Sequence, residues 1–300
     1  MGKDMLEQAS KYDHWAWLYN KTLGPRYGAH KIGPIERVVL PHLPAGGAIL
    51  DLCCGTGQLA AALIERGFVV TGLDGSADML RHARENAPSA TFTEGDACDF
   101  AFDHPFDAVL CTSASLNHIQ RIDDLAAVFS SVSSALRPGG IFVFDVNHPA
   151  QMARYWHGKA TEGEINSDFA WLITPQYDLG TGNGTFTVDI YHRPHERPSS
   201  ALDRLAGRLT RSHRMRRIRL ALLSSFRRLR PHWEHHSVIN RVWGHDLDAV
   251  LLALRKSGFS AEVRSTQGGA VDDSHAAYFF CRKAAATEAQ AETETLEASR

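Results

Sequence analysis

The stretch of sequence that decides the fold is Ile49-Leu50-Asp51-Leu52-Cys53-Cys54-Gly55-Thr56-Gly57-Gln58-Leu59-Ala60. It joins an apolar strand to a helix through a glycine loop, and one carboxylate stands near the end of the strand. Gly55 and Gly57 lack the side chains that would keep a ligand from the backbone, while the start of the helix offers free amides and a positive dipole end. The pattern predicts a loop that holds a nucleotide-containing cofactor.

A second acidic residue sharpens this prediction. Asp74 ends the apolar run Phe68-Val69-Val70-Thr71-Gly72-Leu73, at about the distance at which a ribose-binding acid follows such a loop. The position of Asp51 favours one kind of cofactor over another. A carboxylate before the loop repels the pyrophosphate of a dinucleotide but suits a ligand with an ammonium group. S-adenosylmethionine carries such a group, so the two acids favour it over a dinucleotide. The alternative is that the glycines are ordinary turn residues and that Asp74 caps a helix.

Three further motifs follow in order along the chain. They are Glu94-Gly95-Asp96-Ala97 after a third strand, Phe106-Asp107-Ala108-Val109-Leu110-Cys111 as a fourth strand, and the turn and fifth strand from Leu136 to Asp145. With the first two motifs, they make the chain resemble the class I S-adenosylmethionine-dependent methyltransferases of the small-molecule type. The resemblance covers about residues 41–150, a final helix and a final strand pair. It implies S-adenosylmethionine as cofactor and S-adenosylhomocysteine as product.

The resemblance also implies which residues form the cofactor site. In that family the first strand end and the glycines hold the methionine part, the second-strand acid holds the ribose, and an Asp-hydrophobic pair flanks the adenine. An amino-terminal tyrosine often closes over the cofactor, although aromatic side chains here could equally cover the sheet. The implied set is Tyr19, Tyr27, Asp51, Cys53, Gly55, Gly57, Asp74, Gly75, Met79, Asp96, Ala97, Cys111 and Thr112.

Strands and helices alternate from Ile49 to Val146, which predicts an α/β fold with right-handed crossovers. We expect a Rossmann-like, doubly wound sheet of seven strands, mostly parallel with an antiparallel last strand. The expected domains are a helical lid (1–40), the cofactor-binding core (41–150 and 242–283), an inserted acceptor subdomain (151–241) and a disordered tail (284–300). An aromatic helical stretch, Tyr12 to Asn20, opens the lid.

The insertion combines two kinds of segment. Alternating runs at 169–173, 185–191 and 233–242 predict antiparallel strands, resembling the accessory sheet over the acceptor site of sugar-amine and glycine N-methyltransferases. Residues 201–230 carry ten arginines and a single acid, with apolar residues at mostly helical spacing, and predict a basic amphipathic helix in the lid. Such a helix is compatible with packing by its leucines, with peripheral membrane contact, with an anionic substrate or with nucleic acid.

Composition indicates which binding partners and which cellular compartment to expect. The chain has 300 residues, 44% hydrophobic residues and a formal net charge of -2, so a nucleic-acid partner is disfavoured. Its five cysteines have neither disulfide-framework nor metal-site spacing, so we expect reduced thiols and no metal. The amino terminus lacks an apolar signal core and no segment is long enough to span a membrane, so we expect a cytoplasmic protein.

Methyl transfer depends mainly on holding the acceptor in line with the methyl group, and a base matters only where the acceptor must lose a proton. The candidates are His118 first, then Asn117 and His148, near the expected ends of the fourth and fifth strands. The chain has 16 histidines, so an incidental loop histidine is the competing interpretation.

The sequence predicts methyl transfer by in-line displacement to nitrogen or oxygen of a small-molecule acceptor. Residues 111–114 read Cys-Thr-Ser-Ala and lack the Asn/Asp-Pro-Pro-Tyr/Phe signature of exocyclic-amine nucleic-acid methyltransferases. Three alternatives remain open: an RNA methyltransferase that grips phosphates with the arginine-rich helix, a non-catalytic S-adenosylmethionine-binding protein, and a nicotinamide oxidoreductase.

Overall fold

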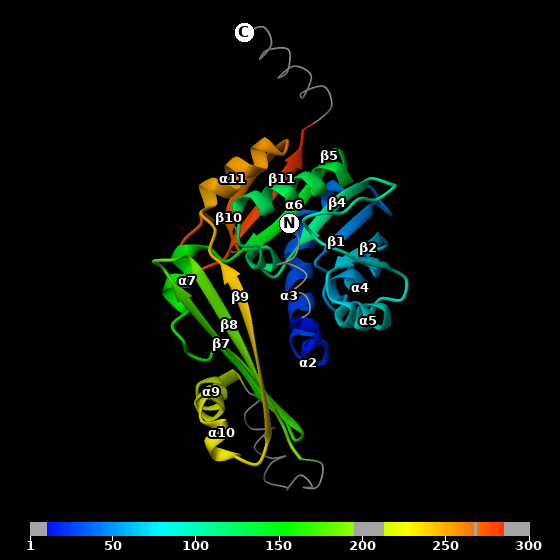
Figure 1. Ribbon diagram of the computed structural model, residues 1–300. Coiled ribbons are helices and arrows are strands. Elements are labelled where there is room, and N and C mark those ends of the chain that lie inside the picture. Colours follow the sequence, from blue (N-terminus) through cyan, green and yellow to red (C-terminus); the bar gives the residue numbers. More distant parts are fainter. Residues whose placement is uncertain (1–10, 195–212, 267–268, 285–300) are drawn as a thin grey trace. The chain divides into compact units, whose positions relative to one another are not determined.

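The computed structural model describes residues 11–194, 213–266 and 269–284. The chain divides into two compact units, which we call the core unit and the inserted unit (Figure 1). The core unit comprises Met1–Gln151 and Trp243–Arg300, and the inserted unit comprises Met152–Val242.

The core unit is built on a seven-stranded sheet in the order β10-β11-β5-β4-β1-β2-β3. Its strands are β1 (Ala48–Leu52), β2 (Val69–Asp74), β3 (Thr91–Glu94), β4 (Phe106–Cys111), β5 (Leu136–Val146), β10 (Phe259–Ser265) and β11 (Ala277–Lys283). The pairs from β5 to β3 are parallel, whereas β11 runs antiparallel to both of its neighbours, β5 and β10. The predicted α/β class and the mostly parallel sheet with an antiparallel last strand are confirmed.

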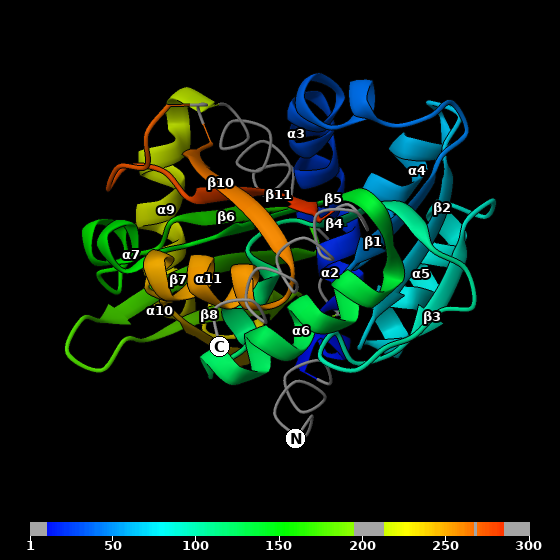
Figure 2. The same cartoon turned by 90° about the horizontal axis from the view of Figure 1, so that it is seen from above.

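Helices cover both faces of this sheet (Figure 2). One face packs against α6 (Ile122–Ala135) and α11 (Leu247–Lys256), and the other against α3 (Leu23–Val38) and α4 (Gln58–Ile64). The remaining helical elements of this unit are α2 (Ala16–Lys21), α5 (Ala77–Asn86), η1 (Leu40–His42) and η2 (Ser115–His118), and α7 (Pro149–Tyr155) crosses into the inserted unit. Because the central strands are buried on both faces, they read in the sequence as continuous apolar runs.

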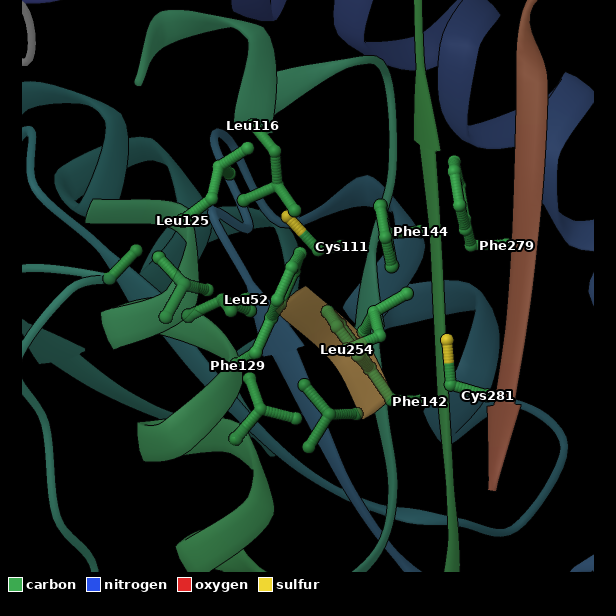
Figure 3. Packing of buried hydrophobic residues seen from close by; sticks show 14 of the residues in the cluster. Leu52, Cys111, Leu116, Leu125, Phe129, Phe142, Phe144, Leu254, Phe279 and Cys281 are labelled. Carbon is green, nitrogen blue, oxygen red and sulfur yellow. The ribbon is translucent and has the colours of Figure 1, made fainter. Parts of the chain in front are cut away.

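Aromatic side chains fill the core under α6 and α11 (Figure 3). The rings of Phe144 and Phe279 stack with centroids 4.6 Å apart, which joins β5 to β11. Phe129 of α6 packs at 5.6 Å from Phe144. Burying such rings contributes about 2–3 kcal/mol each, so this cluster fixes the order of the strands that present the site.

The inserted unit contains a four-stranded antiparallel sheet in the order β6-β7-β8-β9. Its elements are β6 (Glu162–Ile165), β7 (Phe169–Asp178), β8 (Asn183–His192), β9 (Glu234–Trp243), η3 (His213–Met215), α9 (Arg216–Ser224) and α10 (Phe226–Leu229). The three predicted strands are present. The fourth, β6, escaped prediction because its sequence, Glu-Gly-Glu-Ile, has a single large apolar residue.

Two predicted helices differ from the structure. The aromatic stretch from Tyr12 is interrupted by a turn at residues 14–15, and α2 begins only at Ala16. In the expected helix 201–230, residues 201–212 lie outside the described part, and the rest breaks at Ser225 into α9 and α10. The hydroxyl of Ser224 donates to the carbonyl of Leu220, four residues back, a bond that competes with regular helix geometry.

Two further expectations concern the carboxy-terminal tail and membrane-spanning helices. The predicted tail lies outside the described residues from position 285 onward. Within the described ranges, no helix combines the length and apolarity needed to cross a membrane.

Candidate functional site

The site is centred on Asp51 at the end of β1, a strand that lies between β4 and β2. Asp51 is 2% exposed, and its Oδ2 atom has no hydrogen-bond partner among the described residues. Burial, reinforced by nearby Asp74, raises the pKa of this carboxyl to about 8. A buried carboxyl is costly without a partner, so this position suits a cationic group that pairs with it.

The loop after β1 favours glycine at two positions because of its backbone conformation, and at one of them also because of close packing. Gly55 and Gly57 have φ angles of 53° and 77°, in the left-handed region that favours glycine. A Cβ atom on Gly57 would lie 2.9 Å from the Cα atom of Ala83, whereas one on Gly55 would meet only Tyr19, at 3.7 Å from Cε1. Cys53 adopts the same left-handed conformation, with φ of 58°. The backbone thus stays accessible at Gly55 and is tightly packed at Gly57.

Asp74, at the end of β2, organises this loop from the neighbouring strand. Its Oδ2 atom accepts a hydrogen bond from the amide of Gly55 at 2.8 Å, and its Oδ1 atom accepts one from the amide of Ser76 at 3.0 Å. Burial raises the pKa of Asp74. Hydrogen bonds from the amides of Ser76, Gly55 and Gly75 lower it by less, so the net pKa is raised. Each carboxylate oxygen retains a second lone pair, so Asp74 can hold the loop and still accept from hydroxyl groups.

The amino-terminal segment is tied to the same place. A carboxylate oxygen of Asp13 accepts hydrogen bonds from the Ser76 hydroxyl and from the Asp78 amide. The rings of Tyr19 and Tyr27 lie edge to face with centroids 6.2 Å apart. Since Tyr19 also approaches Gly55, the structure brings Tyr19 next to the glycine loop and Tyr27 next to Tyr19.

Tyr12 connects this segment to the region after β4. Its hydroxyl lies 2.8 Å from Nε2 of His118, and the two rings meet edge to face. Burial, followed by the charges of Tyr19 and Asp74, raises the pKa of Tyr12 well above its usual range, so the hydroxyl keeps its proton. It can donate to a His118 ring protonated at Nδ1 or accept from one protonated at Nε2. His118 therefore sits beside the predicted cofactor residues.

The other predicted cofactor positions follow the ends of β2, β3 and β4. Met79 is buried, and its amide donates to the Ser76 hydroxyl at the start of α5. Asp96 lies two residues beyond β3 and accepts a hydrogen bond from the amide of Cys98, with the buried Ala97 between them. Cys111 is buried as the last residue of β4, and Thr112 follows it. Carboxyl ends of parallel strands share one edge of a sheet, so these residues line the edge that carries Asp51.

Two predicted catalytic candidates, Asn117 and His148, are hydrogen-bonded to backbone groups. The Asn117 amide nitrogen donates to the carbonyls of Asn147 and Trp243, and its oxygen accepts from the Asn147 amide. Nε2 of His148 lies 3.0 Å from the carbonyl oxygen of Asp272. Both side chains are buried and bonded to backbone, whereas His118 pairs with the hydroxyl of Tyr12.

The sequence interpretation missed a partly buried ion pair at the end of β5. Nζ of Lys31 on α3 lies 3.0 Å from Oδ2 of Asp145, and Oδ1 of Asp145 accepts a hydrogen bond from the Ser113 amide at 2.7 Å. Burial lowers the pKa of Lys31, but Asp145 and Tyr278 outweigh it and the net pKa is raised. The pair ties α3, which carries Tyr27, to the loop after β4. The strand-end position of Asp145 was the only signal for it in the sequence.

Tyr12 and Asp13 were also missed, although they begin the aromatic stretch that drew attention to Tyr19.

The inserted unit has unpaired buried groups of its own. Asn240 on β9 is fully buried with neither amide atom hydrogen-bonded, and the indole nitrogen of Trp171 on β7 is likewise unpaired within the described residues. These groups are suited to a polar ligand, and nothing in the sequence pattern distinguished them from sheet residues.

Comparisons with known proteins find methyltransferases among the relatives. A family model described as a methyltransferase domain matches residues 49–140. The methyltransferase sll0829 of Synechocystis is 34% identical over 187 residues, which cover 59% of this chain and 86% of that protein. YqeM of Bacillus subtilis is 41% identical over 134 residues, covering 43% of this chain and 54% of that protein.

A third relative is a sugar-modifying enzyme. The dTDP-3-amino-3,4,6-trideoxy-alpha-D-glucopyranose N,N-dimethyltransferase of Streptomyces venezuelae is 31% identical over 140 residues, which cover 47% of this chain and 57% of that protein. The chain thus spans little more than half the length of this relative and of YqeM.

Solved structures share the fold. An S-adenosylmethionine-dependent methyltransferase from Clostridium acetobutylicum superposes with a TM-score of 0.66 at 17% identity, covering 91% of this chain and 99% of that one. DesVI of Streptomyces venezuelae superposes with a TM-score of 0.65 at 20% identity, covering 89% and 96%. With the match to sll0829 and the methyltransferase-domain model, the chain belongs to the S-adenosylmethionine-dependent methyltransferase family.

Proposed function

We propose that this protein transfers a methyl group from S-adenosylmethionine to an amine nitrogen of a small-molecule acceptor by in-line displacement. The observation that carries the cofactor half of this proposal is the buried Oδ2 atom of Asp51, which has no partner among the described residues beside an accessible glycine loop. The names of amino-sugar N,N-dimethyltransferases among the relatives support nitrogen as the accepting atom.

The residues at the strand ends fit S-adenosylmethionine. Asp51 would pair with the ammonium group, and the backbone at Gly55 would approach the methionine part. Asp74 would accept from the ribose hydroxyls while keeping its bonds to the loop. Asp96 and Ala97 would flank the adenine. The bound cofactor supplies an already activated methyl group on its sulfonium.

The protein's own contribution to the reaction is then mostly position. Tyr12 and His118 form a hydrogen-bonded pair next to the proposed cofactor-binding residues, and the pair can orient an amine or accept its proton. An amine that is protonated at neutral pH must lose that proton before its lone pair can attack, so a histidine at this place has a defined task. Both side chains of the pair are half-buried.

Two buried side chains within the inserted unit, Asn240 and Trp171, suit a polar ligand. The amide of Asn240 offers two donors and an acceptor, and the indole of Trp171 offers one donor. Buried polar groups that stay unpaired reject ligands that cannot satisfy them. Within that unit, these groups would favour a ligand with hydroxyl or amine substituents over a purely apolar one.

The test is calorimetric titration with S-adenosylmethionine, S-adenosylhomocysteine and NAD, followed by mass spectrometry of a panel of amino sugars, catechols and RNA incubated with the cofactor. We expect binding of the first two ligands and a mass gain of one methyl group on an amine. Binding of NAD alone would instead indicate an oxidoreductase. Cofactor binding with methylated RNA, with methylated oxygen only, or without any product would overturn the acceptor half of the proposal.

A further inference from the structure

The arginine-rich segment of the inserted unit presents apolar side chains that packing does not explain. In α9 and α10, Leu223 and Phe226 are buried in a cluster with Leu172, Tyr191 and Trp233 of the same unit. Leu220 packs partly against the same cluster, but three other large apolar residues are exposed: Ile218 by 52%, Leu222 by 38% and Leu229 by 51%. The leucine packing that holds α9 and α10 on the sheet therefore accounts for only part of their apolar side chains.

The exposed residues share the outer side of α9. At about 100° per residue, Ile218 lies roughly 140° around the helix from the buried Leu223, and Ala221 lies roughly 160° from it. Leu222 stands one turn after Ile218, at the i+4 position. Arg214 and Arg217 are exposed around these residues. The outer surface of α9 is thus an apolar strip with cations beside it.

The charge of the segment is one-sided. Residues 213–230 contain seven arginines and no acidic residue, although the whole chain has a net charge of -2. A solvated helix stabilised by ion pairs would mix both signs along its surface. Arginines around exposed aliphatic side chains instead fit a surface that is anionic on the outside and apolar just beneath.

We propose that Arg214, Arg217, Ile218 and Leu222 form a docking surface for an anionic lipid membrane, with the aliphatic side chains entering the headgroup boundary. The arginines would contact lipid phosphates, and Arg216 would be the fixed end of the surface because it donates to the carbonyl of Thr161. Nucleic acid fits less well, since a phosphate backbone rewards the cations but gives exposed Ile218 and Leu222 nothing to enter.

The experiment is sedimentation of the full chain with vesicles of phosphatidylcholine alone or mixed with phosphatidylglycerol, at low and high salt. We expect binding only to the anionic vesicles, weakened by salt. Arg214→Gln with Arg217→Gln should reduce this binding about thirtyfold, because each cation near an anionic surface contributes a factor of about five. Ile218→Gln with Leu222→Gln should reduce it about tenfold or more.

Matched controls use exposed residues of the core unit. Arg37→Gln with Arg255→Gln removes two exposed arginines, and Leu252→Gln removes an apolar side chain that is 52% exposed, so neither should change vesicle binding. Circular dichroism checks that every variant is folded. Absence of binding to anionic vesicles would overturn the proposal. So would binding that survives Ile218→Gln with Leu222→Gln, tight RNA binding lost with the arginines, or a dimer that dissociates in the aliphatic variant.

Discussion

The backbone amide of Gly55 donates a 2.8 Å hydrogen bond to Oδ2 of Asp74, 19 residues further along the chain. This bond links the loop after β1 to the end of β2, so the residue proposed to bind the ribose also shapes the loop proposed to bind the methionine part. The two functions of Asp74 cannot be separated by removing its side chain.

Asp74→Ala should therefore lower both stability and cofactor affinity. Two backbone amides, those of Gly55 and Ser76, lose their acceptor, which costs about 2 kcal/mol of unfolding free energy, and S-adenosylmethionine affinity should fall more than tenfold. Asp74→Asn keeps one acceptor oxygen and should lie between the wild type and the alanine variant. Urea denaturation and calorimetry measure the two effects. Full stability of Asp74→Ala would contradict the structural role.

Asp51 should make the unliganded protein less stable as pH rises. Its pKa is about 8 in the folded state against an ordinary 3.8, so between these values the folded state holds a proton that the unfolded chain has released. The unfolding free energy contributed by this group is complete below about pH 4 and is lost as pH rises through about 8. Asp51→Asn removes this contribution and should be more stable than the wild type at about pH 8. Denaturant titrations of both proteins across this range would reveal the difference, and parallel curves would refute it.

Cofactor binding should release a proton from Asp51. An ammonium group pairs with the ionised carboxylate, so affinity for S-adenosylmethionine should rise between about pH 6 and pH 7.5, below the titration of an α-amino group. Calorimetry in buffers with different ionisation enthalpies counts the released proton directly. Asp51→Asn should bind more weakly and release none. An affinity independent of pH in the wild type would count against the pairing.

Tyr12 and His118 should affect turnover more than cofactor affinity. We expect Tyr12→Phe and His118→Ala each to lower kcat at least tenfold with the methylated amine found in the acceptor screen, because the pair orients the acceptor or takes its proton. Tyr155→Phe, at a tyrosine 44% exposed, serves as control. Unchanged kcat in both variants would return His118 to the status of an incidental loop histidine.

The Lys31–Asp145 pair should contribute to stability as a unit. Lys31→Met leaves the Asp145 carboxylate buried without its cation and should cost about 3 kcal/mol. Lys31→Met combined with Asp145→Asn removes both charges and should recover part of that loss. Thermal and urea unfolding of the four proteins form a double-mutant cycle. Additive losses in the double variant would mean that the two side chains act independently.

Local patterns predicted the core well because each depends on a short segment. The run from Ile49 to Ala60 specifies a buried strand, a glycine turn and a helix within twelve residues, and β1 and α4 follow it closely. The order of strand, helix and acid then predicted the parallel sheet. The prediction of one helix across Ser225 was wrong. Apolar spacing shows which side of a helix is buried but not whether the helix is continuous, and the helix is interrupted at the serine pair Ser224 and Ser225.

The sequence by itself determined the family, the sheet and the acids at its edge, since hydrophobic periodicity and glycine stereochemistry act over neighbouring residues. Only the tertiary structure decided which side chains meet. Tyr12 and His118 are 106 residues apart, and Lys31 and Asp145 are 114 apart. No local pattern encodes such a pairing, because it arises when packing brings separate elements to one edge of the sheet. The same packing uses Asn117 and His148 to bond backbone and leaves Oδ2 of Asp51 unpaired among the described residues, which is how the fold distinguishes supporting polar groups from one available to a ligand.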